Sequence, residues 1–178
     1  MPDQAWQKFR NLNLLRQLNL AELSNYPKYG RELMNEYEWL RCDSDPRSMI
    51  EHAQSKISAR IMRLICCACV RRVWDQLVDE RSRAAVQASE AFADGQITEF
   101  QLIERRKSAY QAWLLIGESD WRCKAAKAAK AAAAAFEVAN EETYLMINAI
   151  DSAACATDSA EEEREAQCYI IRQFVRNY

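Results

Sequence analysis

The sequence predicts an all-α fold, a single-domain bundle of about seven or eight helices. Three observations lead to this prediction. The 178 residues include only three Gly and three Pro, alternating runs of β-branched residues are missing, and helix-capping residues precede most of the apolar stretches. The chain is 49% hydrophobic and 28% charged, which is typical of a globular domain and not of a disordered chain.

The first elements are read from their start and stop signals. Pro2 opens a helix expected to run to about Leu23, and residues 24–30 form a loop rich in turn residues. A second helix is expected over residues 31–41, and Asp45-Pro46 is the N-cap and first turn of a short third one. We interpret residues 1–30 as an appendage, an N-terminal helix and loop, and residues 31–178 as the helical domain.

A long helix near 58–78 is expected to be the centre of the bundle. Ser58 is its N-cap, and apolar residues then occupy nearly every face. A helix that is apolar all round is normally surrounded by other helices. The apolar residues are Ile61, Met62, Leu64, Ile65, Cys66, Ala68, Cys69, Val73 and Trp74.

Two further helices are expected after this central one. Asp79 caps a helix that ends near Gly95, a residue suited to the left-handed position after a helix. Thr98 and Gln101 have capping-box spacing and open a helix that runs to about Ile116, before Gly117.

The C-terminal part is expected to hold an Ala-rich helix and a final helix. The Ala-rich helix runs from Ser119 to about Ala156, with a break near Asn140. Ser159 and Glu162 then have the capping-box spacing that starts the last helix.

Charge is distributed unevenly along the chain. Residues 1–55 carry about −1, residues 56–130 about +5 and residues 131–178 about −6. The basic middle and the acidic end can pair in the fold, or the middle can bind nucleic acid if its cations converge on one surface. The candidate cations for that surface are Arg60, Arg63, Arg71, Arg72, Lys124, Lys127 and Lys130.

A dense group of charges, which we term the charged corner, follows the central helix. Asp75 lies four residues after Arg71, and Arg83 four residues after Asp79, which is the spacing of helical ion pairs. The corner is interpreted as structural ion pairs, with binding of an anionic partner as the alternative. It consists of Arg71, Arg72, Asp75, Asp79, Glu80, Arg81 and Arg83.

The seven cysteines are interpreted as buried thiols. Cys66 and Cys69 share a helical face, but a tetrahedral zinc site needs four convergent ligands and no second C-x-x-C pair is present. No glycine-rich phosphate loop, dinucleotide fingerprint or acidic metal loop occurs either. We therefore expect no metal and no cofactor.

His52 is the only histidine, so histidine-dependent catalysis would have to use it. No nucleophile elbow accompanies it. Arg47 and His52 do fit the R-x4-6-H pattern of HEPN-type helical ribonucleases, in which these two residue types act at the scissile phosphate of RNA. A single His meets an Arg at such a spacing often by chance, so we interpret His52 as a partly exposed residue of a short helix.

Several motifs resemble an uncharacterised family of bacterial helical proteins. They are E-W-L-x-C from Glu38, D-P from Asp45, R-L-I-C-C-A-C-V-R-R-V-W from Arg63, D-E-R-S-R-x-A-V from Asp79, A-D-G ending at Gly95, and Q-C-Y-I-I-R from Gln167. The resemblance is strongest over residues 36–95. It implies no established activity and no catalytic residues, and it does not extend to the first 35 residues.

Two functional hypotheses follow. The preferred one is a helical interaction or adaptor module, not an enzyme, that binds another protein through a helix face or groove. The alternative is a nucleic-acid-binding protein or HEPN-like ribonuclease that uses the basic middle with Arg47 and His52. No apolar run reaches the roughly 20 residues that span a bilayer, and the start of the chain does not look like a secretory signal. We expect a cytoplasmic protein.

Overall fold

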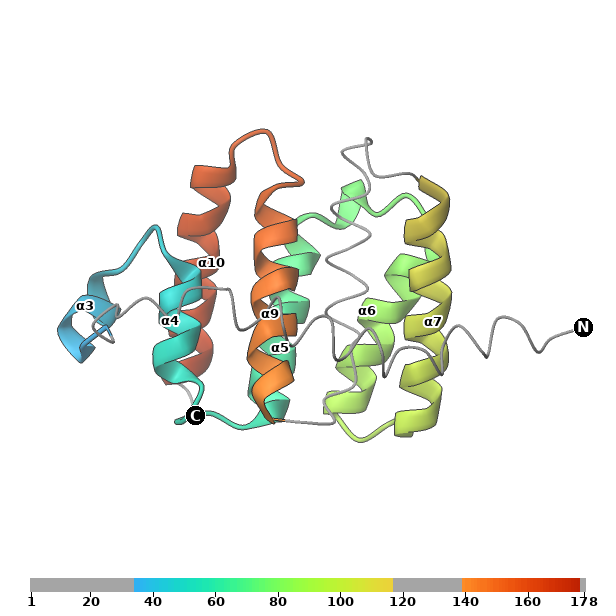
Figure 1. The fold of residues 1–178 in the computed structure, drawn as a ribbon, viewed down its shortest axis with the longest axis horizontal. Helices are drawn as coiled ribbons and strands as arrows, with labels where there is room; N and C mark the ends of the chain where they lie inside the picture. The colour runs from blue at the N-terminus through green and yellow to red at the C-terminus, as the bar shows by residue number, and fades with distance from the viewer. Residues whose placement is uncertain (1–33, 117–138, 177–178) are drawn as a thin grey trace, which may run out of the picture. The chain divides into compact units, whose positions relative to one another are not determined.

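The computed structural model describes residues 34–116 and 139–176, and all statements about structure refer to these. They belong to one compact unit, Met34–Tyr178, and contain seven α-helices and a 3-10 turn, with no strand among the described residues (Figure 1). The all-α prediction is confirmed. The elements are α3 (Glu36–Arg41), α4 (Pro46–Ala53), α5 (Ala59–Arg72), η1 (Trp74–Gln76), α6 (Glu80–Ala93), α7 (Glu99–Ile116), α9 (Ala139–Ala154) and α10 (Ala160–Arg176).

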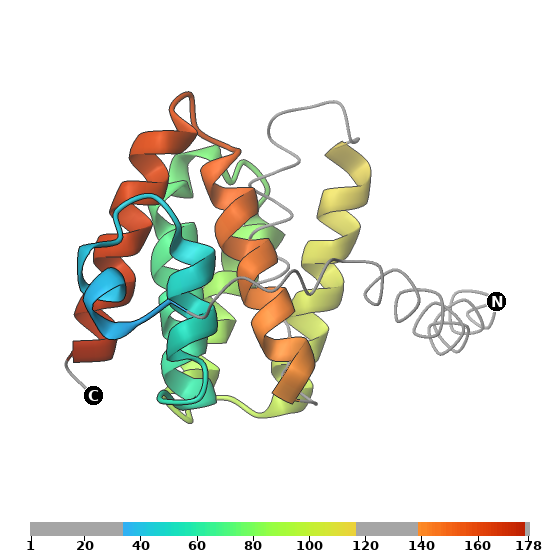
Figure 2. The ribbon, with the colours of Figure 1, turned by 60° about the vertical axis from the view of Figure 1, so that its left-hand side comes forward.

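Helix α5 is the centre of the bundle, as its all-round apolar pattern predicts. It packs against α6, α9 and α10, and α4 packs against α9 and α10. The turned view shows α4, α9 and α10 gathered around α5 (Figure 2). The core side chains Ile65, Val70, Met49, Ile150 and Ile171 come from these helices and are at most 1% exposed.

The α6–α7 hairpin stands at one end of the bundle, opposite α3 (Figure 1). Helix α7 packs chiefly on α6, through a small second core of Ala85, Ala88, Leu102 and Ala109. Three of these four residues are alanines, so the two helices can approach closely. This end of the molecule therefore depends on far less buried apolar surface than the centre does.

The predicted caps are largely confirmed. Asp45, Ser58 and Asp79 each accept a hydrogen bond from a main-chain N–H of the helix that follows. Thr98 and Gln101 form the expected reciprocal pair, with N···O distances of 2.8 Å and 3.3 Å. Gly95 has a φ of 70°, the left-handed conformation expected after α6.

Two predicted helix boundaries are wrong. The central helix ends at Arg72 instead of Val78, because the chain tightens into the 3-10 turn η1. Its apolar pattern continues through the turn because Val73 and Leu77 are both buried at 1% exposure, so the pattern reports burial and not helix. The helix expected from residue 31 begins at Glu36, where Asn35 and Glu38 form a capping box.

Several predictions lie outside the described residues. They are the helix over 2–23, the loop over 24–30, the domain boundary at 30/31, the stop at Gly117, the Ala-rich part before Ala139, and the three lysines Lys124, Lys127 and Lys130.

Candidate functional site

In the charged corner, Arg71 binds a carboxylate of the neighbouring helix. Its Nε and Nη2 donate to the two carboxylate oxygens of Glu90 on α6, at 2.9 Å and 2.6 Å. The same guanidinium lies 4.0 Å from the centroid of the Trp74 ring, and Arg83 lies 5.6 Å from it. Trp74 thus contacts two cations, and these contacts join the end of α5 to α6.

Arg72 reaches across the bundle to α10. Its Nε donates to both carboxylate oxygens of Glu163, at 3.0 Å and 2.9 Å. The Glu163 side chain is only 5% exposed, and burial raises its pKa although Arg72 and Gln167 act in the opposite direction. Gln167 donates to the Ile150 main-chain oxygen and, at 3.4 Å, to Glu163, which connects α9 and α10 in one polar network.

The remaining corner residues pair close to their own position in the chain. Arg81 donates from Nε and Nη2 to the Asp79 carboxylate, at 3.0 Å and 2.7 Å, and the hydrogen bond from its side chain lowers the pKa of Asp79. Arg83 binds Glu80 at 3.1 Å. Asp79 lies outside the helix as its N-cap, so it cannot form the i,i+4 pair with Arg83 that the spacing predicts. The predicted ion pair between Arg71 and Asp75 does not form either, because α5 ends between the two residues and Arg71 binds Glu90 instead.

The residues of the ribonuclease hypothesis are held apart on α4. Arg47 binds Asp151 of α9 at 2.7 Å. The His52 Nδ1 bonds to the main-chain oxygen of Met34, and its Nε2 lies 2.8 Å from Lys56 Nζ. A carbonyl only accepts and an ammonium only donates, so both ring nitrogens are engaged within the protein. His52 follows Arg47 at an offset of five positions, which places the two residues about 140° apart around the helix axis.

The described cations of the basic middle do not form an open basic surface. Arg60 binds the Ala93 main-chain oxygen and Asp94. Arg63 is only 3% exposed and lies 4.8 Å from the Phe92 ring centroid. Together with Arg71 and Arg72, these side chains connect α5 to α6 and α10.

The thiols of α5 are buried in the core. Cys66, Cys67 and Cys69 are at most 1% exposed. Burial raises the pKa of all three, to about 11 for Cys67, so they remain protonated and poorly nucleophilic. Within the described part, no three His, Cys, Asp or Glu side chains come together as a metal site requires.

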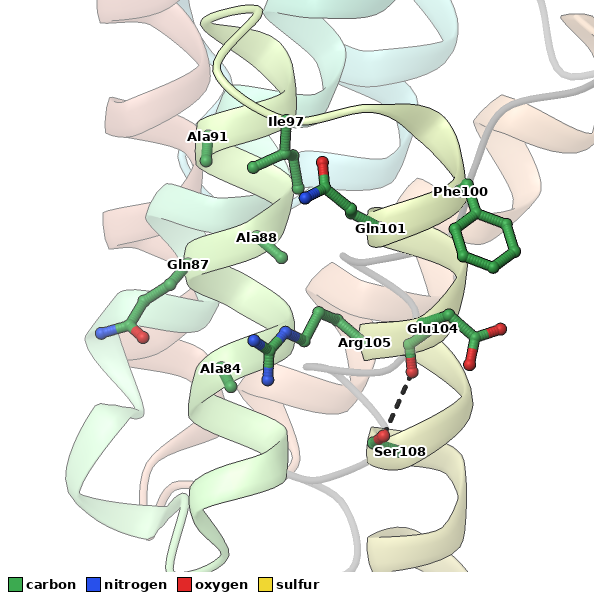
Figure 3. A pocket seen from close by; sticks show the side chains of 10 residues that line it. All are labelled: Ala84, Gln87, Ala88, Ala91, Ile97, Phe100, Gln101, Glu104, Arg105 and Ser108. Carbon is green, nitrogen blue, oxygen red and sulfur yellow. Dashed lines mark hydrogen bonds between the residues drawn. The ribbon is translucent and has the colours of Figure 1, made fainter.

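A groove that the sequence analysis missed runs along the α6–α7 hairpin (Figure 3). Its volume is about 540 Å³. On the α6 side, Ala84, Ala88 and Ala91 line it at spacings of four and three residues, and Arg105 extends from α7 toward them (Figure 3). The other lining residues are Gln87, Ile97, Phe100, Gln101, Glu104 and Ser108. Alanines and glutamines carry no chemical motif, so only the i,i+4,i+7 alanine spacing on α6 could have indicated this surface.

The two charged groups of the groove differ in how they are paired. Glu104 forms an ion pair with Lys107 at 2.6 Å. Arg105 is exposed and forms no ion pair among the described residues. In Figure 3 its guanidinium lies between the two helices, over the alanine wall. It is therefore the charge that the groove offers to a ligand.

The chain matches no protein-family model, no curated protein and no solved structure. The family resemblance drawn from the motifs therefore stays a prediction. No described helix combines the length and the apolar character needed to cross a membrane.

Proposed function

We propose that this protein is a helical interaction module and that the α6–α7 groove binds an amphipathic helix of a partner protein. One observation carries the proposal, namely an alanine-lined groove into which Arg105 is directed, an arginine with no ion pair among the described residues. The charged corner supports the proposal indirectly. Its arginines are each bound to carboxylates of this chain, so they are less available to a partner.

The shape of the groove suits a helix. Two helices joined by a short loop leave a furrow between them, and a third helix can lie there with its side chains between theirs. The small side chains of Ala84, Ala88 and Ala91 allow the backbone of a third helix to come close to α6. Phe100, at 70% exposure, lies at the rim and offers an aromatic contact.

The charge of the groove defines the partner further. Arg105 has no ion pair within the part of the chain that the structure describes, whereas Glu104 is paired with Lys107. The groove therefore favours a helix with an Asp or Glu beside its apolar stripe. The partner we propose therefore has small or medium apolar side chains at helical spacing and at least one carboxylate on their flank.

The contacts on α4 and α5 argue against the nuclease and nucleic-acid alternative. Both nitrogens of His52 are engaged, and Arg47 is bound to Asp151. A phosphate backbone would need a row of cations facing solvent, whereas Arg60, Arg71 and Arg72 are each bound to a carboxylate of another element.

Site-specific photo-cross-linking tests this proposal. A benzophenone amino acid at Gln87, in the groove, should capture a partner from the native lysate, and the same amino acid at Gln54, an exposed residue at the end of α4, is the matched control. The captured segment should be helical with a flanking carboxylate. Arg105→Glu should weaken binding of that purified partner about tenfold or more, and Arg176→Glu on α10 should not.

Three outcomes contradict the proposal. The first is equal capture from Gln87 and Gln54. The second is a partner whose affinity is unchanged by Arg105→Glu. The third is capture of a second copy of this chain only, which would make the groove an oligomer interface, a result that sedimentation would verify.

A further inference from the structure

Two cysteines that lie outside the groove and outside α5 are brought together by the fold. Cys42 is the C-cap of α3, and Cys168 lies on α10. Both belong to the main core, Cys168 as a fully buried member and Cys42 as a half-buried residue at its edge. They are 126 positions apart in the sequence, and the fold brings their thiols into hydrogen-bond contact.

The hydrogen bonds around this pair form a short relay. Cys168 and Cys42 share a side-chain hydrogen bond, which favours the protonated form of Cys168. The Cys42 thiol in turn donates to the main-chain oxygen of Asp45, with an S···O distance of 3.5 Å. The Cys42 main chain is itself held by Arg172, one turn after Cys168, so the fold keeps Cys42 beside this part of α10.

An arginine holds the pair in place. Arg172, one turn after Cys168 on α10, donates from Nη1 to the main-chain oxygen of Cys42. Its positive charge also favours the thiolate form of Cys168, against the larger effect of burial, which raises the pKa of that thiol to about 12. Cys168 thus stays protonated, and the half-buried Cys42 is the thiol that a small oxidant in solvent can reach.

We propose that Cys42 and Cys168 form a reversible disulfide when the protein meets a peroxide. In the first step the Cys42 sulfur attacks one peroxide oxygen, the O–O bond breaks, and Cys42 becomes a sulfenic acid as one water leaves. In the second step the Cys168 sulfur attacks the Cys42 sulfur, the S–O bond breaks, and the Cys168 proton leaves with the hydroxyl group as a second water. Two thiols lose two electrons, and the peroxide gains them.

The other described cysteines do not share this arrangement. Cys66, Cys67 and Cys69 are at most 1% exposed and lie on one helix. Cys155 is exposed. These residues supply internal controls, since an indiscriminate oxidation would modify Cys155 first.

Thiol counting and peptide mapping test the proposal on the full-length protein treated with hydrogen peroxide. The number of thiols titrated in denaturant should fall from seven to about five, with a mass loss of about 2 Da, and dithiothreitol should restore both. The non-reduced peptide map should show Cys42 linked to Cys168. Cys155→Ser should leave this link intact.

Two variants separate the chemistry from folding. In Cys42→Ser the link should be lost while Cys168 remains a thiol, and in Cys168→Ser a sulfenic acid should persist at Cys42 and react with dimedone. Circular dichroism of each variant reports whether it folds, and the wild-type peptide map stands independently of both. The proposal is overturned if Cys42 proceeds to sulfinic acid while Cys168 stays reduced, or if Cys42 links to Cys155 or to another molecule.

Discussion

The strongest prediction from the packing is that Leu102→Ala will unfold α7 before it unfolds the core. Leu102 is 0% exposed, and the other buried members of its cluster are Ala85, Ala88 and Ala109. The substitution removes three carbon atoms, a transfer loss of roughly 2.4 kcal/mol at about 0.8 kcal/mol each. Alanine side chains have no rotamers with which to fill the hole, so the cavity term adds to this. We expect Leu102→Ala to lower the free energy of unfolding by about 3–5 kcal/mol in total.

Hydrogen exchange and urea denaturation measure this effect. Helix α7 packs chiefly on α6, so its amides should lose protection while those of α9 and α10 keep most of theirs. The control is Leu115→Ala in the same helix, at 75% exposure, which should change the stability by less than about 0.5 kcal/mol. A cost below about 1 kcal/mol for Leu102→Ala, or an equal loss of protection in all helices, would refute the reasoning.

Three further predictions concern single contacts. Asp79→Ala removes the N-cap of α6 and the carboxylate bound by Arg81, and should lower the unfolding free energy by about 1–2 kcal/mol in urea denaturation; an unchanged midpoint would contradict the capping assignment. Gly95→Ala places a Cβ at a φ of 70°, where nothing else lies within 4 Å, so backbone strain alone should cost about 1 kcal/mol. Burial raises the pKa of Glu163 above its ordinary value of 4.5, so its contribution is fully present below that value and is lost as pH rises through the folded-state pKa. The stability of the wild type relative to Glu163→Gln should therefore fall as the pH rises above 4.5, and parallel pH profiles would show that the carboxyl is not perturbed.

The fold was predictable because most helix boundaries are set by hydrogen bonds between residues close together in the sequence. Asp45, Ser58, Asp79 and Thr98 each bond to an N–H two or three residues later, so the information sits within one turn of the chain. The end of α5 was not predictable in this way. Val73 and Leu77 are apolar and buried in the turn as they would be in an α-helix, so the sequence pattern does not distinguish the two.

The partners of the charged residues were less predictable than the caps. Spacing suggested Asp75 for Arg71, but the actual partner is Glu90, which lies on another helix. Arg72 likewise finds Glu163, 91 residues away. Salt bridges between helices depend on which faces meet, and this follows from the packing of the whole core and not from any short pattern. The groove was missed for the same reason, since it exists only where α6 and α7 lie together.

The contrast between the two ends of the molecule supports placing the interaction at α6–α7. Around α5, described arginines are bound to carboxylates or buried, so that region is closed to a ligand. Helix α7 has one main helix neighbour, and it exposes Phe100, Leu114 and Leu115 by 70%, 56% and 75%. Exposed apolar side chains of this size commonly mark an interaction surface. A helix bound in the groove would contact Phe100 at the rim. Phe100→Ala should therefore weaken partner binding, and Tyr169→Ala on α10, which removes a side chain that is 60% exposed, should not. An affinity that Phe100→Ala leaves unchanged would contradict this placement.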